Sequence, residues 1–373
     1  MGELRLMKGN EVLAEAAIRC GCDGYFGYPI TPQSEVMETL MVREPWNETG
    51  MTVLQAESEV ASINMVYGAA GSGKKVMTSS SSPGISLMAE GISYIAGAEL
   101  PCLVINVQRG GPGLGTIQPS QADYFQSVKG GGHGDYKMIV LAPSSVQEMN
   151  DFVDMGFELA FKYRNPAMIL TDGAIGQMME KVELADFKPR LTDEELNEKY
   201  GDWATTGKPK SRKQNIVTSL ELDSEIMEAN NKRFQQKYKK MEKEDTHYEM
   251  IKCDDADYIL VAFGTSSRVC QKSVEIARAN GLKVGLLRPI TLFPFPKKII
   301  GELAGKVKGF LSVEMSSGQM VEDIKLAVYE AGKNTRVDYF GRMGGIIPNP
   351  DEVIKALEEK FSWEIDYGVK RYY

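Results

Sequence analysis

The sequence predicts an α/β protein made of two doubly wound domains, each with a mostly parallel sheet. Short apolar runs alternate with helical patterns up to about residue 180, and a second alternation begins near residue 258. Between them lies a segment crowded with charges. Such alternation is typical of parallel strands whose connecting helices cover both faces of the sheet. We therefore expect domains at residues 1–185 and 251–373, joined at residues 186–250 by a charged linker that contains a helix.

The first domain is expected to open with a strand and to continue as strand and helix pairs. Asn10 is the expected N-cap of the first helix, which Gly21 ends. Further helices are expected at residues 34–41, 58–71, 85–97 and 145–163, and strands at residues 25–28, 52–54, 76–79, 102–107, 138–141 and 167–171. Together these elements predict one sheet with helices on both sides.

The second domain is expected to hold four strands, at residues 258–263, 283–287 and 309–313 and near Val337. A proline-rich corner at residues 288–296 should lead into a helix. The turn at residues 264–266 could bind phosphate, but we favour Ser266 as a simple helix cap. Residues 225–244 of the linker carry charges of alternating sign, which predicts a solvated helix between the domains.

The overall charge, the first residues and the lengths of the apolar runs exclude several classes of function. The net charge is −8 and the isoelectric point about 5.2. Nucleic-acid binding needs clustered Lys and Arg, so no nucleic-acid partner is expected. The first residues lack the apolar core of a signal peptide, and no apolar run reaches membrane-spanning length. We expect a cytoplasmic protein without a membrane partner.

The cysteines and histidines do not form a metal-binding pattern. The five cysteines are Cys20, Cys22, Cys102, Cys253 and Cys270. No two are spaced as Cys-x-x-Cys, and the chain has only two histidines, so we expect no zinc or iron–sulfur site in it. If the protein takes part in redox chemistry, its metal centre must belong to another chain.

Residues 28–35 and 55–59 each follow an apolar run and precede a helical pattern. Such strand-to-helix corners are where open parallel sheets bind their ligands. Prolines on either side restrain the backbone around Thr31, so its hydroxyl is a candidate ligand contact. In the second corner, Glu57 and Glu59 either complement the helix dipole, or one of them exchanges a proton with a cofactor ring nitrogen. Spacing alone does not decide which glutamate would do so.

Arg109 ends an apolar run and begins a glycine-rich stretch at residues 110–115. Its guanidinium could hold a small carboxylate bidentately or could pair with an acidic residue of the fold. We favour the ligand, because the glycines that follow would serve no packing purpose. Residues 79–84 either cap a helix or let a ligand approach closely, and both readings stay open. His133 lies in a glycine-rich loop without a visible orienting partner.

In combination, these features resemble one family. The segments are Tyr-Pro-Ile-Thr-Pro at residues 28–32, Glu-Ser-Glu at residues 57–59 and Gln-Arg-Gly-Gly-Pro at residues 108–112. The chain is similar, over essentially its whole length, to the α subunit of the thiamine-diphosphate-dependent 2-oxoacid:ferredoxin oxidoreductases of the 2-oxoisovalerate or 2-oxoglutarate type. The resemblance implies a pyrimidine-binding first domain and a second domain like the C-terminal domain of transketolase.

The resemblance also assigns roles to individual residues. Glu59 would be the catalytic residue that contacts the aminopyrimidine nitrogen of thiamine diphosphate, and Glu57 would be structural. Thr31 and Arg109 would hold the carboxylate and carbonyl of the 2-oxoacid. Tyr28 and Ile30 would contact the cofactor. The activity implied is oxidative decarboxylation of a 2-oxoacid with CoA to acyl-CoA and CO2, with electrons passed to ferredoxin.

One departure from a complete thiamine enzyme implies partner subunits. Such enzymes bind the diphosphate through Mg²⁺ on a Gly-Asp-Gly stretch, which is absent from this sequence. The resemblance therefore implies a β subunit that carries the diphosphate, Mg²⁺ and a [4Fe-4S] cluster, together with γ and ferredoxin-like small subunits. The alternatives are a non-catalytic assembly subunit and half of a split transketolase-like transferase. The substrate stays open, although the loop at residues 113–119 favours the branched-chain type by resemblance.

Overall fold

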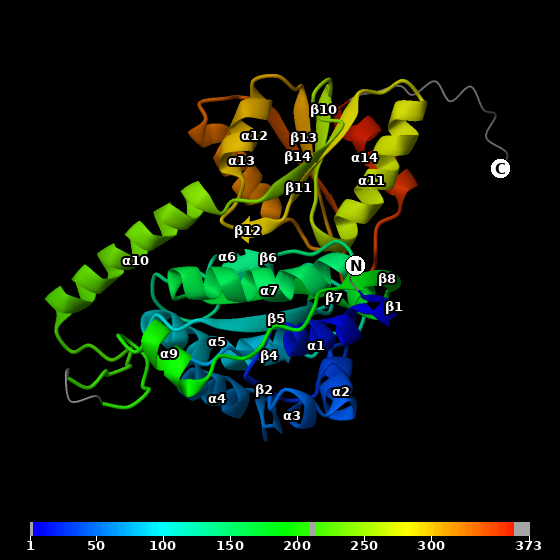
Figure 1. Cartoon of the computed structure of the whole chain (residues 1–373). Helices are drawn as coiled ribbons and strands as arrows, with labels where there is room; N and C mark the ends of the chain where they lie inside the picture. The colour runs from blue at the N-terminus through cyan, green and yellow to red at the C-terminus, as the bar shows by residue number, and fades with distance from the viewer. Residues whose placement is uncertain (1–2, 209–212, 362–373) are drawn as a thin grey trace.

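The computed structural model describes residues 3–208 and 213–361, which contain two main β-sheets (Figure 1). The larger sheet has seven strands, and all except β12 run parallel to their neighbours. In spatial order they are β12 (Thr291–Phe293), β6 (Ile139–Leu141), β7 (Pro166–Asp172), β5 (Cys102–Gln108), β4 (Val76–Ser80), β2 (Gly24–Gly27) and β3 (Thr52–Gln55). The central strands are buried along their whole length, which explains why they read as continuous apolar runs.

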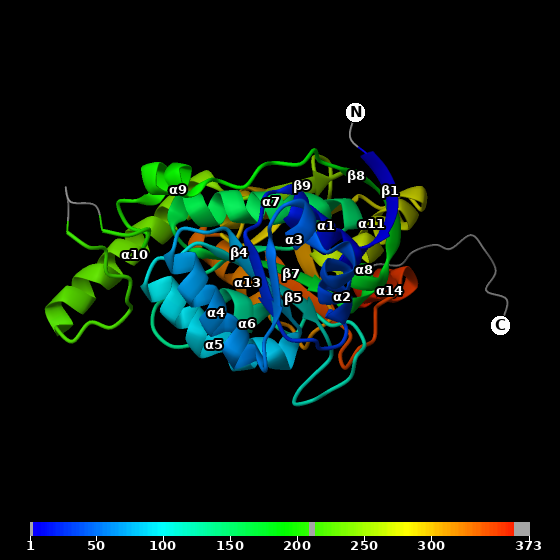
Figure 2. The same cartoon turned by 60° about the horizontal axis from the view of Figure 1, so that its bottom comes forward.

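Helices cover both faces of this sheet and complete what we call the large domain. On one face α1 (Gly9–Arg19) packs against α2 (Ser34–Arg43) and α7 (Val146–Tyr163), and on the other α4 (Glu59–Gly71) packs against α5 (Ser82–Gly97) (Figure 2). The chain moves outward from β2 to β3 and then returns across β2 to β4. The strand order therefore reverses between β2 and β4, and a crevice forms outside the carboxyl ends of strands at such a point.

The second sheet and its helices form what we call the small domain. Only β9 runs antiparallel in this five-stranded sheet. The strands are, in spatial order, β14 (Arg336–Gly341), β13 (Gly309–Glu314), β10 (Tyr258–Val261), β11 (Val284–Pro289) and β9 (Tyr248–Ile251). α11 (Gly264–Ala279) packs against α14 (Pro350–Phe361), and α12 (Lys297–Ala304) packs against α13 (Met320–Glu330). Figure 1 shows this domain above the large one. The two doubly wound, mostly parallel sheets predicted from the sequence are confirmed.

Several short elements lie outside these layers or in the connections. β1 (Glu3–Lys8) and β8 (Met179–Leu184) form an antiparallel ribbon at one side of the large domain. The connections contain the helices α3 (Pro45–Glu48), α6 (Tyr124–Val128), α8 (Gly173–Gln177), α9 (Asp193–Tyr200) and α10 (Ser224–Glu244). No helix within the described parts of the chain has the length and apolar character needed to cross a membrane.

The proline-rich segment at residues 288–296 does more than turn the chain. Its residues Thr291–Phe293 form β12, which pairs antiparallel with β6 and extends the sheet of the large domain. The pairing satisfies backbone groups that the edge strand β6 would otherwise leave open. The small domain gains its fifth strand from β9, at the end of the expected linker. The expectation of four strands in the second domain was therefore wrong. β9 and β12 are each too short for their sequences to show the alternation that indicates a strand.

The linker helix is α10, but it is not solvated on every side. Phe234, Tyr238 and Met241 are buried, and they recur at the spacing of one helix face. The ring of Tyr238 packs edge-on against Phe293, with 6.1 Å between their centroids. The helix therefore packs on the junction between the two domains while its charged face stays in solvent (Figure 1).

Two expected helix caps are wrong for one physical reason. α1 begins at Gly9, and Asn10 is buried and donates through Nδ2 to Pro32 O and to Glu35 Oε2, both at 2.7 Å. Ser266 lies inside α11 and donates to Gln121 Oε1 at 2.6 Å. Buried polar groups need partners, and in both cases a residue distant in sequence supplies one.

Candidate active site

The corner that follows β2 is fixed by a buried hydrogen-bonded chain. The Ser79 hydroxyl donates to Gln33 Oε1 at 2.5 Å and lies 2.8 Å from the Tyr25 hydroxyl. Gln33 in turn donates through Nε2 to Tyr28 O at 3.0 Å, and its backbone N–H donates to Ile30 O. Gln33 is fully buried, whereas Tyr28 and Ile30 are partly exposed. The backbone of the corner is thus anchored to the end of β4, and its side chains are left accessible.

Arg109 joins this corner to the glycine-rich loop. Its guanidinium donates to Thr31 O at 2.9 Å and to Leu114 O at 3.0 Å. Among the residues that the structure describes it makes no ion pair, and its buried Nε has no hydrogen-bond partner. The loop itself closes like a hairpin, with Gly110 N donating to Gln118 O and Thr116 N donating to Gly110 O. The structure therefore brings Thr31 and Arg109 together and gives no support to an ion pair within the fold.

Glu59 occupies the first position of α4, which Ser58 caps through a hydrogen bond from Ala61 N. The side chain of Glu59 is only 6% exposed, whereas that of Glu57 is exposed. In the described parts of the chain the Glu59 carboxylate has neither an ion pair nor a hydrogen-bond donor. The residue as a whole is buried, but its carboxylate oxygens keep contact with solvent and are therefore accessible to a ligand. Spacing could not distinguish the two glutamates, but their burial does.

The lack of a side chain at Gly84 lets the corner after β4 lie close against this carboxylate. A Cβ on Gly84 would clash with Ser80 Oγ and would lie 2.8 Å from Glu59 Oε1. The hydroxyls of Ser80 and Ser81 are buried without partners, and Ser81 precedes α5 without capping it through its side chain. Of the two readings for residues 79–84, close ligand approach therefore fits better than capping. A protonated ring nitrogen, as in an aminopyrimidine, would supply the donor that this carboxylate lacks.

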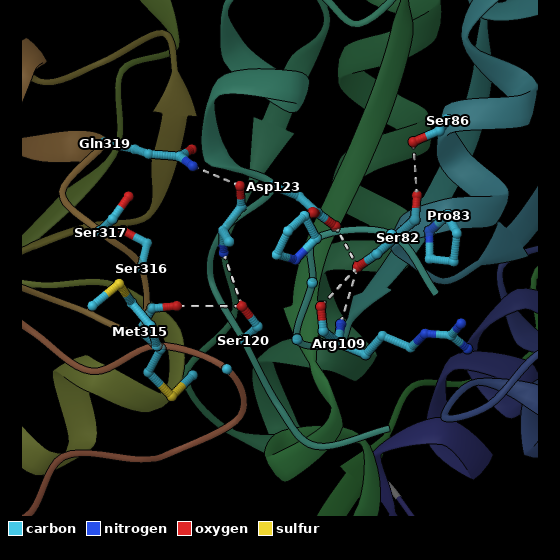
Figure 3. Close-up of a pocket in the computed structure, with 17 residues that line it drawn as sticks. Ser82, Pro83, Ser86, Arg109, Ser120, Asp123, Met315, Ser316, Ser317 and Gln319 are labelled. Carbon is cyan, nitrogen blue, oxygen red and sulfur yellow. Dashed lines mark hydrogen bonds between the residues drawn. The ribbon is translucent and has the colours of Figure 1, made fainter. Parts of the chain in front are cut away.

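A cavity of about 840 Å³ opens between the domains beyond Arg109 (Figure 3). Its walls come from the starts of α5 and α6, the glycine-rich loop, and the small-domain loops that carry Met315 and Met343. Figure 3 shows the Arg109 side chain extending away from Met315 and Gln319. Asp123 is the acidic residue of the lining, and burial raises the pKa of its carboxyl. Of the predicted site residues Arg109 lines this cavity, whereas Thr31 and Glu59 do not, so the small domain adjoins the site at Arg109.

Some functional candidates lie elsewhere, and others could not be found from the sequence. His133 lines a separate cavity with Tyr94 and Phe234, so it does not join the corners. Gln33 and Asp123 carry no local motif, and only tertiary contacts reveal their roles. Within the described residues no three His, Cys, Asp or Glu side chains gather as a metal site. All five cysteines are buried and unpaired.

Two family models match most of the chain. The model described as "Pyruvate flavodoxin/ferredoxin oxidoreductase, thiamine diP-bdg" matches residues 15–246. The model described as "Pyruvate:ferredoxin oxidoreductase core domain II" matches residues 256–353. The chain belongs to the pyruvate flavodoxin/ferredoxin oxidoreductase family, and residues 15–246 are its thiamine-diphosphate-binding part.

Within this family the chain is similar to α-type subunits of 2-oxoacid:ferredoxin oxidoreductases. It is 50% identical to ketoisovalerate oxidoreductase subunit VorB of Methanothermobacter thermautotrophicus, covering 95% of this chain and 97% of the relative. It is 36% identical to 2-oxoglutarate synthase subunit KorA of Methanocaldococcus jannaschii, covering 95% and 99%. The family resemblance that the sequence indicates is confirmed.

Solved structures support the same fold. The 2-oxoglutarate:ferredoxin oxidoreductase from Magnetococcus marinus, solved with 2-oxoglutarate, coenzyme A and succinyl-CoA bound, superimposes with a TM-score of 0.84 at 26% identity. The match covers 96% of this chain and 65% of that longer chain. A split-gene transketolase, described as an inactive β4 tetramer, shares the fold with a TM-score of 0.60 at 11% identity.

Proposed function

We propose that this chain is the α subunit of a branched-chain 2-oxoacid:ferredoxin oxidoreductase. The complex would decarboxylate 2-oxoisovalerate and related acids oxidatively, form acyl-CoA and CO2, and reduce ferredoxin. One observation carries the proposal: two charged groups of the predicted site have no ion pair in the described chain. They are the carboxylate of the buried residue Glu59 and the guanidinium of Arg109, which donates a hydrogen bond to Thr31 O. The 50% identity to a ketoisovalerate oxidoreductase subunit supports the branched-chain substrate.

The residues of this chain would bind and orient the reactants. Glu59 would accept a hydrogen bond from the protonated pyrimidine ring nitrogen of thiamine diphosphate and so hold a proton at that atom. Tyr28 and Ile30 would pack on the cofactor from the same corner. Arg109 and Thr31 would hold the substrate carboxylate and carbonyl, which fixes the orientation of the 2-oxoacid. Bound thiamine diphosphate would supply a carbon nucleophile and a sink for the electrons released on decarboxylation.

The lining of the interdomain cavity supports an apolar substrate side chain. Arg109 is the cation among its lining residues, and Met315, Met343 and Pro112 contribute apolar surface. A second carboxylate, as in 2-oxoglutarate, would need a second cation to offset its desolvation. A branched aliphatic side chain needs only apolar contact. We therefore place 2-oxoisovalerate before 2-oxoglutarate.

A β subunit would complete the site on the side where α4 and α5 meet solvent. Val60 on α4 and Leu87 on α5 are 45% and 55% exposed, and Leu54 on β3 is also exposed. Exposed apolar residues beside a half-completed site favour an interface. We infer that this β subunit brings the diphosphate site, Mg²⁺ and a [4Fe-4S] cluster, that γ and ferredoxin-like small subunits complete the assembly, and that it works in the cytoplasm, where five free thiols stay reduced.

Reconstitution of the complex tests this proposal. The chain would be co-expressed with its partner subunits, purified anaerobically and assayed for reduction of a viologen dye with CoA and a panel of 2-oxoacids. We expect kcat/KM for 2-oxoisovalerate to exceed that for 2-oxoglutarate by at least about 10²-fold, because a desolvated carboxylate without a partner is strongly rejected. A preference for 2-oxoglutarate would overturn the substrate, and transfer chemistry without dye reduction would overturn the reaction.

A further inference from the structure

Asp123 precedes α6 in the position of a helix cap, but its side chain does not cap the helix. No hydrogen bond joins its carboxylate to the first turn of α6. Gln319 of the small domain takes that place, since its Oε1 accepts from Phe125 N at 2.7 Å. The same amide donates through Nε2 to Ala122 O at 2.7 Å (Figure 3). The small domain thus holds the backbone on both sides of Asp123 and leaves the carboxylate available for another contact.

The carboxylate is directed instead at the end of β5 and the start of α5. Asp123 Oδ2 accepts from Ser82 Oγ at 2.6 Å and from Asn106 Nδ2 at 2.9 Å. Asn106 also accepts from Ser82 N through Oδ1 at 3.1 Å, so Ser82 is held at two atoms. Burial raises the pKa of the Asp123 carboxyl, while the two donors oppose that shift. A buried network whose members are satisfied in this way holds its side chains rigidly.

Ser82 connects the Asp123 carboxylate to Arg109 by a second hydrogen bond. Its hydroxyl accepts from Arg109 N at 3.0 Å, and the guanidinium of Arg109 then donates to Thr31 O at 2.9 Å. A serine hydroxyl has a single proton, so donation to Asp123 leaves its lone pairs directed at the Arg109 N–H. The hydrogen-bonded chain therefore runs from Gln319 through Asp123, Ser82 and Arg109 to the Thr31 corner.

We propose that Asp123 is a positioning residue for substrate binding, which orients Ser82 and through it the backbone of Arg109, and that Gln319 makes this arrangement depend on the small domain. The proposal rests on the proposed function, because it assumes that Arg109 holds the 2-oxoacid carboxylate. Asp123 acts on Arg109 through Ser82. Its contribution is to fix the backbone from which the Arg109 guanidinium extends, at the start of the glycine-rich loop.

Kinetics of the assembled complex test the proposal. In Asp123→Ala, Ser82 Oγ loses its nearer acceptor and is left with Arg109 O, at 3.3 Å. We expect the KM for the 2-oxoacid to rise about 5- to 50-fold while kcat changes less than about threefold. The KM for CoA should stay unchanged. Asp123→Asn should remain within about threefold of the wild type, because the amide oxygen can accept from both Ser82 and Asn106. Ser82→Ala breaks the same link from its other side and should show the same rise in KM, even where Asp123→Ala fails to assemble.

Asp323→Ala is the matched control. This carboxylate is also buried between the domains, where it accepts from the Tyr124 hydroxyl at 2.7 Å and pairs with Lys129, but it has no contact with Ser82 or Arg109. We expect it to lower the melting temperature and to leave the KM for the 2-oxoacid unchanged. An equal rise in KM in this control, or an unchanged KM in Ser82→Ala, would refute the positioning role.

Hydrogen exchange separates this proposal from the proposed function. The Arg109 amide donates to Ser82 Oγ, so it should exchange at least about tenfold faster in Ser82→Ala, where this acceptor is removed, than in the wild type. It should also exchange faster in Asp123→Ala than in Asp123→Asn, because Ser82 Oγ is then no longer held in place by the carboxylate. This measurement needs no turnover. A wild-type complex that oxidises no 2-oxoacid would end the proposed function, whereas equal exchange in all four proteins would end the positioning role alone.

Discussion

Two strand-to-helix corners in this protein are rich in hydroxyls, and they differ in how those hydroxyls are used. In the small domain, Thr265 donates to Asp172 Oδ1 at 2.8 Å and Ser266 donates to Gln121 Oε1 at 2.6 Å, so both hydroxyls bind the large domain. In the large domain, Ser79 and Ser82 are hydrogen-bonded, but the hydroxyls of Ser80 and Ser81 between them are buried without partners. The bonded hydroxyls of the small domain serve an interface within the chain, and the two unpaired ones are the pair that our proposal leaves to a ligand.

The same contrast separates the charged groups of the molecule. Arg288 of the small domain makes two hydrogen bonds to Glu148 and one to Glu249, and Glu314 accepts from three backbone N–H groups at the start of α13. Glu59 has no comparable donor among the described residues. The charged groups that join parts of the fold are therefore paired, whereas the Glu59 carboxylate is left without a partner in the described chain.

The largest expected effect is the loss of activity in Glu59→Gln. Without a carboxylate to hold the ring proton, we expect kcat to fall by about 10²- to 10⁴-fold, measured as dye reduction by the assembled complex. Stability should not fall, because no internal partner is lost. Glu57→Gln, a change at an exposed neighbour, is the control and should keep full activity. An active Glu59→Gln complex would favour the alternative of a non-catalytic assembly subunit.

A methyl group at Gly84 should be the next most damaging change. Gly84→Ala would force a Cβ against Ser80 Oγ and Glu59 Oε1, and we expect a loss of about 1–3 kcal/mol in unfolding free energy, as for other overpacked sites. Cofactor affinity should fall with it. Gly68→Ala in α4 is the control, because nothing lies within 4 Å of its Cβ position. That change should stabilise the helix by about 0.5–1 kcal/mol. Equal effects at both glycines would contradict the close contact of Gly84 with Ser80 and Glu59.

Removing a paired hydroxyl should cost stability without affecting catalysis. Thr265→Val deletes the donor to Asp172, and we expect a loss of about 1–2 kcal/mol in chemical denaturation with little change in KM. Ser81→Ala deletes a buried hydroxyl that has no partner, so it should be neutral within about 0.5 kcal/mol or slightly stabilising. The contrast between the two corners would fail if Ser81→Ala were the more destabilising of the pair.

The smallest expected effect concerns the pH dependence of stability. Burial raises the pKa of Asp172 above its ordinary value, although Thr265 and backbone donors oppose the shift. The folded state then binds this proton more tightly than the unfolded state, so the stabilising contribution of protonated Asp172 is lost as the pH rises through its folded pKa. Asp172→Asn cannot titrate. Relative to this variant, the wild type should gain melting temperature as the pH falls from neutrality, and the opposite slope would contradict the raised pKa.

The sequence predicted the parts of the molecule that local pattern governs. The alternation of apolar runs and helical patterns predicted both sheets. The ends of the apolar runs, with the prolines and glycines near them, predicted the corners at Thr31, Glu59 and Arg109. It failed where a group far along the chain decides the outcome. β12 joins the other domain's sheet, and Asn10 and Ser266 serve tertiary partners instead of capping helices. Propensity and capping rules consider only residues close in sequence. These groups instead form hydrogen bonds with residues that are distant in sequence and close in space.

By itself, the sequence determined the fold class, the family and the set of residues that could act on a 2-oxoacid, because periodicity and motifs are written in consecutive residues. The family resemblance already favoured Glu59 over Glu57, and the tertiary structure adds that Glu59 is buried and Glu57 exposed. Only the tertiary structure showed that Arg109 makes no ion pair in the described chain and that the Asp123 carboxylate is directed at Ser82 instead of α6. The physical reason is that burial and hydrogen-bond partnership depend on which strands and domains come together. Burial and hydrogen-bond partnership decide whether a polar side chain stabilises the fold or remains available to a ligand.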